Sequence, residues 1–255
     1  MLKLDAYKLK WIAIIGMILS HTVYAWWEYM PMGLQLPLSA LGGFTFPIMA
    51  FFVVEGYRHT SNLKKYILRL LIFAVIATPF HFLVIAVPGL NILFTIILSL
   101  LVLAMYDSIK KRAIFWVLYI IVIVPISLLF FEFFFLGVTM VLLYHIIKKE
   151  SVRRVLPPIA FGVSLLTMSV FGLLFLPSNP MPAEGFYALF RNATWINSAD
   201  YMKNAIVFSV VCLLVAILIK NYNGERGKRM KWLFYIMYPL HFAVFAAISL
   251  ALGLW

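Results

Sequence analysis

The sequence predicts an all-α protein, a polytopic transmembrane helical bundle with about nine spans and its N-terminus inside. Three observations indicate this fold class. Of the 255 residues, 65% are hydrophobic and only 12% are charged, which leaves too few charged side chains to cover a soluble domain. The apolar residues fall into segments of roughly membrane-spanning length, about 20 residues each. The basic residues, in turn, are concentrated on one side of the predicted membrane.

The whole chain, residues 1–255, is expected to form a single integral membrane domain, because no polar stretch is longer than a loop. No small-residue cleavage site follows the first apolar segment, so this segment is predicted to be a span and not a removed signal peptide. The single cysteine, Cys212, excludes an intrachain disulfide and a cysteine-based metal site. We therefore expect no bound metal.

Nine segments are apolar enough to cross the hydrocarbon core, namely 11–27, 38–57, 66–87, 89–106, 113–131, 133–147, 155–176, 202–219 and 232–252. The sixth is short and is expected to be tilted little or to be partly re-entrant. This count places successive connections on alternate sides of the membrane, so the distribution of charge tests it.

The basic residues support the count of nine. Of the 21 Lys and Arg residues, 19 precede the first segment or follow the second, fourth, sixth and eighth, and only Arg191 and Lys203 lie on the other side. The net charge of +12 therefore indicates membrane topology and contact with membrane lipid, and no nucleic acid is expected as a partner. The long connection 177–200 then lies outside, where its aromatic residues either anchor neighbouring spans or cover the mouth of a cavity.

The first span carries ionisable residues, which are costly in lipid and usually face the bundle interior. His21 lies ten residues into this span, with Lys10 eleven positions before it and Glu28 seven positions after it. At about 3.6 residues per turn, the three side chains would follow one helix face from the inner surface to the outer surface. The alternative is a snorkelling lysine, an interhelical histidine and an interfacial glutamate. His81 and His145 lie near span ends and are interpreted as interfacial.

The second span contains Pro47 at its middle, which is expected to kink the helix. Near its inner end, Glu55 is three positions from Arg58 and four from His59, spacings that bring side chains together on a helix. This group is either a local ion pair or part of a polar cavity.

Two further spans carry polar residues at helical spacing. Asn91 and Thr95 share one face of the fourth span with Ser99, as expected for helix packing or for a ligand path. In the last span Pro239 leaves a backbone carbonyl without its helical donor, and Tyr238 and His241 flank it. A tyrosine and a histidine beside such a break are typical of a lined cavity.

Four stretches resemble the TraX family of membrane proteins, which is named for a conjugation protein that acetylates pilin. They are "LKWIAIIGMILSHT", "FPIMAFFVVEGYRHTSNLKKYILRLLIFAVI", "LNILFTIIL" and "WLFYIMYPLHFAVF". The order and spacing of these stretches carry the resemblance, whereas residues 107–200 match only in general character. The family usually has an aspartate where this chain has Ser20, and an arginine near the start of the second span, where this chain has Gly43.

The family is similar to a larger group of membrane acyltransferases, in which ten residues separate a basic residue from a histidine in the first span. Lys10 and His21 fit that spacing. The resemblance implies an acetyltransferase of the bacterial cytoplasmic membrane that uses acetyl-CoA or another acyl-CoA as donor, with a peptide or other small extracytoplasmic acceptor. His21 would be the general base or a transient acyl carrier. Lys10, Lys64, Lys65 and Arg69 would bind the CoA phosphates at the inner surface, where cations also contact anionic lipid.

Two other classes of protein fit parts of the sequence. A transporter or flippase for an anionic lipid or peptide would also use histidines and prolines inside its spans, but it usually has two related halves, and no such repeat is detected. A structural assembly subunit would have tightly packed or lipid-facing histidines and no cavity. A continuous passage from the basic inner surface to His21 would favour the acyltransferase.

Overall fold

The structure of the chain is a computed structural model that describes residues 3–85, 89–175, 198–229 and 231–254. Within these residues the secondary structure is α-helical, apart from short 3-10 and π-helical turns and two isolated β-bridges. The predicted all-α fold class is therefore confirmed.

Each of the nine predicted spans corresponds to one helix or to two helices in tandem. In chain order these are α1 (Ala6–Ala25), α2 (Met32–Leu41) with α3 (Thr45–His59), α4 (Leu63–Ile85), α5 (Ile92–Ser108), α6 (Arg112–Leu118) with α7 (Val124–Phe130), α8 (Phe134–Ile146), α10 (Leu156–Phe175), α12 (Ser198–Lys220) and α13 (Lys231–Ala251). A single short helix, α9 (Glu150–Arg153), precedes α10. Among the described residues, five stretches are long and apolar enough to cross a membrane, and three shorter helices are also apolar. The protein is a polytopic helical membrane protein.

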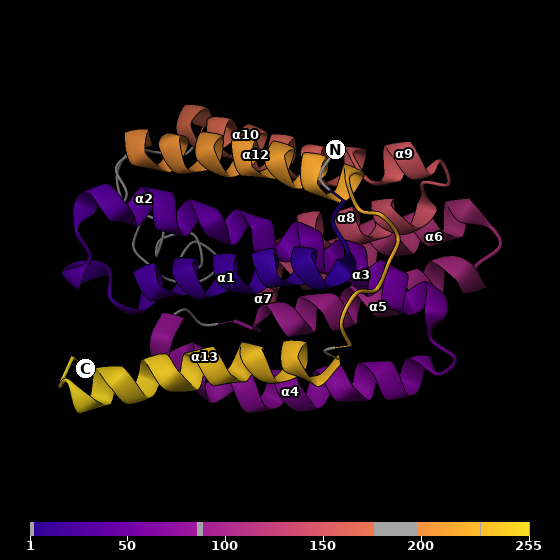
Figure 1. Cartoon of the computed structure of the whole chain (residues 1–255). Helices are drawn as coiled ribbons and strands as arrows, with labels where there is room; N and C mark the ends of the chain where they lie inside the picture. Colours follow the sequence, from indigo (N-terminus) through magenta and orange to yellow (C-terminus); the bar gives the residue numbers. More distant parts are fainter. Residues whose placement is uncertain (1–2, 86–88, 176–197, 230, 255) are drawn as a thin grey trace.

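The helices lie side by side along one common direction (Figure 1). The pair α10 and α12 forms one edge of the bundle and the pair α4 and α13 the opposite edge, with α1 and α3 between them. The N-terminus and the C-terminus lie at opposite ends, as an odd number of crossings requires.

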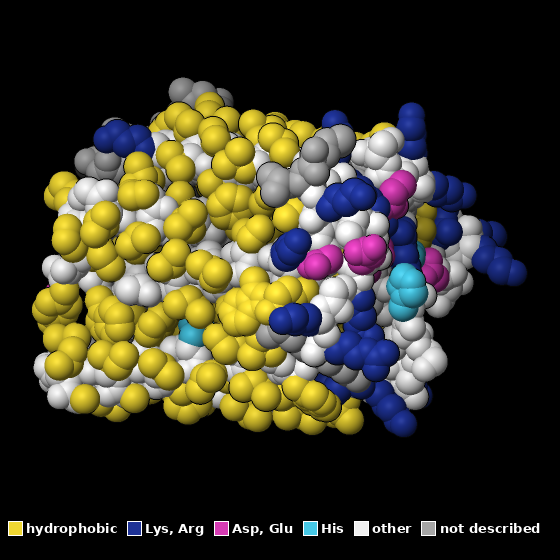
Figure 2. All heavy atoms as spheres, viewed as in Figure 1, with side chains coloured by type: hydrophobic (Ala, Val, Ile, Leu, Met, Phe, Trp, Pro, Cys, Tyr) yellow, Lys and Arg dark blue, Asp and Glu magenta, His cyan; other side chains and the backbone are white. Residues whose placement is uncertain are grey.

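Charged side chains gather at the end of the bundle that contains the N-terminus, while hydrophobic side chains cover much of the remaining length (Figure 2). This basic end consists of the polar residues in the ranges 3–10, 58–69, 107–112, 145–154 and 220–229. The basic residues that the sequence predicts to lie on one side of the membrane thus gather at one end of the bundle, the end that the positive-inside rule predicts to be inside.

The start of α1 is fixed at the basic end. The Asp5 carboxylate caps the helix by accepting a hydrogen bond from the Lys8 backbone N–H at 2.8 Å. Leu4 bonds the chain beyond α12, with its N–H donating to the Asn221 carbonyl and its carbonyl accepting from the Asn223 N–H. These contacts hold the inner end of the helix that carries His21.

The break in the second span lies at Gly42–Phe44, a single 3-10 turn, and not at Pro47 as predicted. Pro47 lies in the first turn of α3, where a residue without an N–H costs nothing because that N–H has no helical acceptor. Close packing explains the glycines at the break. A Cβ at Gly42 would lie 2.6 Å from Ser20 Oγ, and one at Gly43 would lie 2.9 Å from Val211 Cγ1.

The polar face predicted along the first span is interrupted before Glu28. The helix α1 ends at Ala25, and Glu28 lies in the following 3-10 turn, Trp27–Tyr29. Trp26, which caps the helix, leaves the helical conformation, and its indole N–H donates to Ser249 Oγ at 2.9 Å. Lys10 and His21 therefore belong to one continuous helix, but Glu28 does not.

Candidate active site

A cavity of about 630 Å³ lies inside the bundle, in the half away from the basic end. Helices α1, α2, α3, α4, α5, α7, α10, α12 and α13 contribute to its lining. Gly89 and Leu90 line it from the connection before α5, Phe131–Phe134 from the turn before α8, and Asn204 from the outer part of α12. The lining is mostly apolar, so its few ionisable side chains are the candidates for chemistry.

Two histidines from opposite ends of the sequence meet beside this cavity, where His21 belongs to the lining and His241 does not. His21 lines it from α1, and His21 Nδ1 lies 2.7 Å from His241 Nε2 on α13. The two rings are nearly parallel, with an interplanar angle of 10°. The other nitrogen of His241, Nδ1, lies 2.9 Å from the Met237 carbonyl, and the residue is only 4% exposed.

A second polar pair faces the same cavity. His81, on α4, is 6% exposed, and its Nε2 lies 2.8 Å from Glu132 Oε1. His81 lies four positions before the end of α4, near a span end as predicted, but it is buried and lines the cavity together with Glu132. The Phe242 ring contacts both His21 and His81, with ring centroids 4.8 and 5.2 Å away, so one aromatic side chain connects the two pairs.

Glu132, which the sequence did not indicate as a site residue, is placed in the cavity by an unusual turn. The two residues after it, Phe133 and Phe134, have left-handed backbones with φ of 56° and 47°, a conformation uncommon for any residue with a side chain. Such strain persists where surrounding contacts hold it. The Glu132 carbonyl accepts a hydrogen bond from Thr95 Oγ1 at 2.9 Å, and the Phe133 ring stacks on Phe46.

Asn91 and Thr95, at the start of α5, connect neighbouring elements of the bundle and lie outside the cavity lining. The Asn91 side chain caps α5 by accepting from the Leu93 N–H, and its amide donates to the Ala74 carbonyl of α4. Asn91 and Thr95 are fully buried and are absent from the cavity lining, so they join helices and do not form a ligand path. Tyr238, by contrast, lines the cavity from α13.

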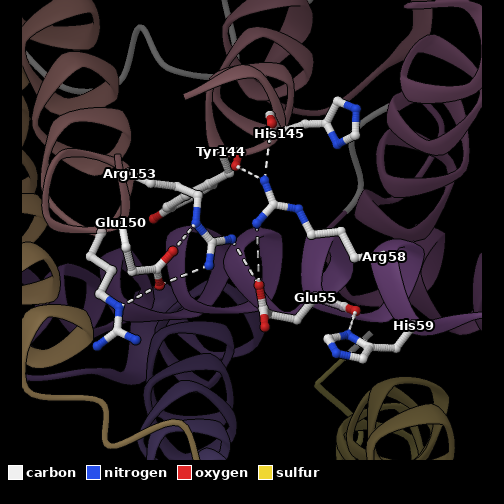
Figure 3. A network of polar contacts seen from close by, with 8 residues as sticks. Glu55, Arg58, His59, Tyr144, His145, Glu150 and Arg153 are labelled. Atoms are coloured by element: carbon white, nitrogen blue, oxygen red, sulfur yellow. Dashed lines mark hydrogen bonds and ion pairs between the residues drawn. The ribbon is translucent and has the colours of Figure 1, made fainter. Parts of the chain in front are cut away.

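Glu55 and His59, predicted as cavity candidates, lie instead in a polar network at the basic end (Figure 3). The Glu55 carboxylate accepts a hydrogen bond from Arg153 at 2.8 Å and lies 3.8 Å from Arg58, its predicted partner at i+3. His59 Nδ1 contacts the Glu55 backbone carbonyl, not its carboxylate. The predicted i+3 contact between Glu55 and Arg58 is present, whereas the shorter contact of the Glu55 carboxylate is with Arg153, which is distant in sequence.

Residues 6–249 match the family model described as TraX protein. The chain belongs to the TraX family. It is also 27% identical over 274 aligned positions to a protein of Dichelobacter nodosus named probable fimbrial assembly protein FimC, serogroup H1, and the alignment covers 97% of each chain. Among solved structures, none matches the chain.

The cations that the TraX resemblance assigned to CoA belong to the basic end, and Lys10 lies nearest the cavity. The Lys10 ammonium is 4.9 Å from the centroids of both the Phe52 and the Phe234 rings, and Phe234 lines the cavity. Lys64 and Lys65 are exposed. Arg69 is half-buried over the Tyr66 ring, and its Nε is buried without a hydrogen bond to any described residue.

This TraX-family cavity thus offers imidazole and carboxylate groups in apolar surroundings, which suits proton transfer at a reacting centre. Within the part of the chain that the structure describes, no group of three or more His, Cys, Asp or Glu side chains is arranged to hold a metal ion. The connection 177–200, expected to lie over the outer side, falls outside the described residues up to position 197, and its last three residues begin α12.

Proposed function

We propose that this protein is an acyltransferase of the bacterial cytoplasmic membrane. It would pass an acyl group, acetyl in the simplest case, from cytoplasmic acyl-CoA to a peptide or other small acceptor on the outer side. Membership of the TraX family supports this, since the family is named for a protein that acetylates pilin. The relative named as a fimbrial assembly protein is likewise associated with a protein fibre.

The observation that carries the proposal is the position of His21 on the wall of an internal cavity. A lipid-facing or closely packed histidine would favour a structural role, whereas His21 has both a cavity beside it and a buried partner, His241. Intramembrane ionisable residues with such an arrangement mark functional sites by default.

The reaction needs one base, and His21 can supply it. The acceptor's amine or hydroxyl attacks the thioester carbonyl while its proton passes to the imidazole of His21. The carbon–sulfur bond then breaks, and the CoA thiolate leaves with the proton from the imidazolium. Transient transfer of the acyl group to His21 is the alternative route, and it would give the same products.

The donor would bind at the basic end. Lys10, Lys64, Lys65 and Arg69 are placed along α1 and α4 near that end, where guanidinium and ammonium groups can contact CoA phosphates. Lys10 lies nearest the cavity, against the Phe234 ring that forms part of its wall. A donor held there would have its acyl end directed toward His21.

The test uses purified protein in lipid nanodiscs, acetyl-CoA labelled in the acetyl group, and a peptide extract from the membrane fraction of cells. Wild-type protein should label an acceptor, and His21→Ala should reduce labelling by about 10²-fold or more, the low end of a general base's contribution. Thr167→Ala is the matched control, because Thr167 is exposed on α10, outside the cavity lining.

Two results would contradict the proposal. Turnover by His21→Ala near the wild-type level would leave His21 as a packing residue. Failure of wild-type protein to label any acceptor, combined with movement of an anionic lipid or peptide across proteoliposomes, would establish the transporter instead.

A further inference from the structure

The hydrogen bonds of His241 determine which nitrogen of His21 is available for chemistry. The starting point is the Met237 carbonyl, which has no hydrogen and can only accept. Because His241 Nδ1 lies 2.9 Å from that oxygen, His241 Nδ1 must carry the hydrogen of the bond and donate it.

The next bond follows from the first. In a neutral imidazole one nitrogen carries hydrogen and the other has a lone pair, so a neutral His241 presents a bare Nε2. His21 Nδ1 lies 2.7 Å from it, and this bond forms only if His21 Nδ1 is the donor. A general base must begin neutral, which leaves His21 Nε2 as the nitrogen with the lone pair.

The remaining nitrogen has access to the cavity. Among the described residues, no side chain or backbone group is hydrogen-bonded to His21 Nε2, and His21 lines the cavity wall. The buried side-chain nitrogens without partners lie elsewhere, on Trp11, Arg69 and His145. A substrate in the cavity could therefore reach this lone pair.

Packing holds His241 in the orientation that these bonds require. The residue is 4% exposed, and its ring contacts Phe242, with centroids 4.0 Å apart, and the edge of Phe245, at 5.7 Å and 90°. Tyr238 contacts a further side of the ring at 5.7 Å. With Met237 and His241 one turn apart on the same helix, the acceptor and the ring are fixed relative to each other.

We infer that His241 is a positioning residue that keeps hydrogen on His21 Nδ1, so that His21 Nε2 is the reacting nitrogen of the proposed acyl transfer. The inference rests on the proposed function for the reaction itself. His21 Nε2 takes the proton from the acceptor and later returns it to the CoA thiolate. His241 gains and loses no proton in this cycle, and its Nε2 lone pair faces the Nδ1–H of the imidazolium while the charge is present. Fixing the tautomer of a catalytic imidazole in this way is a recognised role for a hydrogen-bonded neighbour.

A spectroscopic test addresses the tautomer without requiring activity. Nitrogen-15 spectra of histidine-labelled protein in nanodiscs distinguish hydrogen-bearing from bare ring nitrogens, and comparison with His21→Gln identifies the His21 signals among the five histidines. The expected wild-type result, at a pH where His21 is neutral, is hydrogen on Nδ1 and a bare Nε2. The reverse tautomer would overturn the inference.

Two variants of His241 provide the kinetic test. His241→Leu removes both hydrogen bonds and should lower kcat by about 10²-fold or more while KM for acetyl-CoA stays within about twofold. His241→Gln can donate to the Met237 carbonyl and accept from His21 Nδ1, so it should restore kcat to within about tenfold and keep the wild-type tautomer. Thr167→Ala is again the control, and folding is checked by the elution profile and thermal midpoint of each variant.

The outcomes separate this inference from the proposed function. Wild-type kcat and tautomer in a folded His241→Leu protein would overturn the inference while leaving the acyltransferase intact. A different result would separate the two claims. If wild-type protein transfers no acyl group, but His21 no longer keeps its hydrogen on Nδ1 in His241→Leu, then the proposed function fails and the positioning role of His241 stands. Equal loss of kcat in the leucine and glutamine variants, with the tautomer kept in both, would also overturn the inference, because activity would then not depend on the tautomer.

Discussion

Arg153 gives the sharpest quantitative prediction about stability. Its side chain is almost completely buried at the basic end, 4% exposed, and lies over the Phe51 ring. It donates to Glu150 through Nε and Nη2 at 2.7 and 2.8 Å, and to Glu55 through Nη1 at 2.8 Å (Figure 3). Replacing it by methionine keeps much of the apolar stem and removes every one of these bonds.

The expected cost depends on how exposed each partner is. A hydrogen bond to a charged group contributes about 1.5–3 kcal/mol. The Glu150 side chain is 47% exposed and retains Arg154, so solvent screening reduces the net loss there to roughly 1 kcal/mol or less. The Glu55 side chain is 24% exposed, and without Arg153 its remaining ion pair is the one with Arg58 at 3.8 Å. Loss of the Arg153–Glu55 bond is therefore expected to cost its whole contribution, about 1.5–3 kcal/mol. The sum is a loss of about 2–4 kcal/mol of unfolding free energy.

The assay is reversible unfolding in mixed micelles, with Arg153→Met, Glu55→Gln and the double variant compared in a double-mutant cycle. The two single changes should be coupled by about 1–3 kcal/mol, because they remove the two ends of one bond. Lys148→Met is the matched control, since Lys148 is an exposed cation at the same end. A loss below about 1 kcal/mol, or additive single changes, would refute this account of the network.

Three further predictions concern the proposed donor site, the α1–α2 contact and the cavity carboxylate. Arg69→Glu should weaken acetyl-CoA binding about tenfold or more without altering membrane insertion, as measured by equilibrium binding, and unchanged affinity would leave Arg69 as a topology signal. Gly42→Ala should lose about 1–3 kcal/mol in thermal unfolding, because its Cβ would lie 2.6 Å from Ser20 Oγ, whereas Gly33→Ala, with nothing within 4 Å, should not. Glu132→Gln should lower turnover about tenfold through loss of a charge-assisted bond, and wild-type turnover would exclude a role for its charge.

The spans were predictable because one physical requirement determines them. A helix must carry about 20 apolar residues to cross lipid, and basic residues collect on the inner side, so length and charge give two independent signals. The position of a break inside a span is determined differently, by local helix geometry and by packing against other helices. Pro47 does not break the second span because it lies in a first turn, and the actual break depends on how closely Gly42 approaches Ser20. That approach is a tertiary contact, which spacing along the sequence does not encode.

The candidate site was predictable only in part for the same reason. His21 and His241 attract attention as ionisable residues deep in apolar segments. Glu132 stands between two apolar runs, where an acidic residue is ordinarily a solvated span end. It faces the cavity because Phe133 and Phe134 adopt left-handed conformations, and no residue type at those positions indicates them. The place of His81 in the cavity lining was not predictable from its position near a span end, because the cavity is formed by helices remote in sequence.

The inner boundary of the cavity determines what part of a donor would have to enter it. Lys10 contacts the Phe234 ring of the wall, and His21 lies eleven positions after Lys10 on α1, which corresponds to a rise of about 16 Å. Under the proposed reaction the CoA phosphates would stay with the cations at the basic end, because an apolar cavity cannot replace their hydration. Only the uncharged, acyl-bearing arm of the donor would pass Phe234. Lys10, a half-buried cation at that point, would bind the CoA phosphate group nearest the acyl-bearing arm. It would thereby keep the charged part of CoA outside the cavity, which accounts for a lysine so close to an apolar wall.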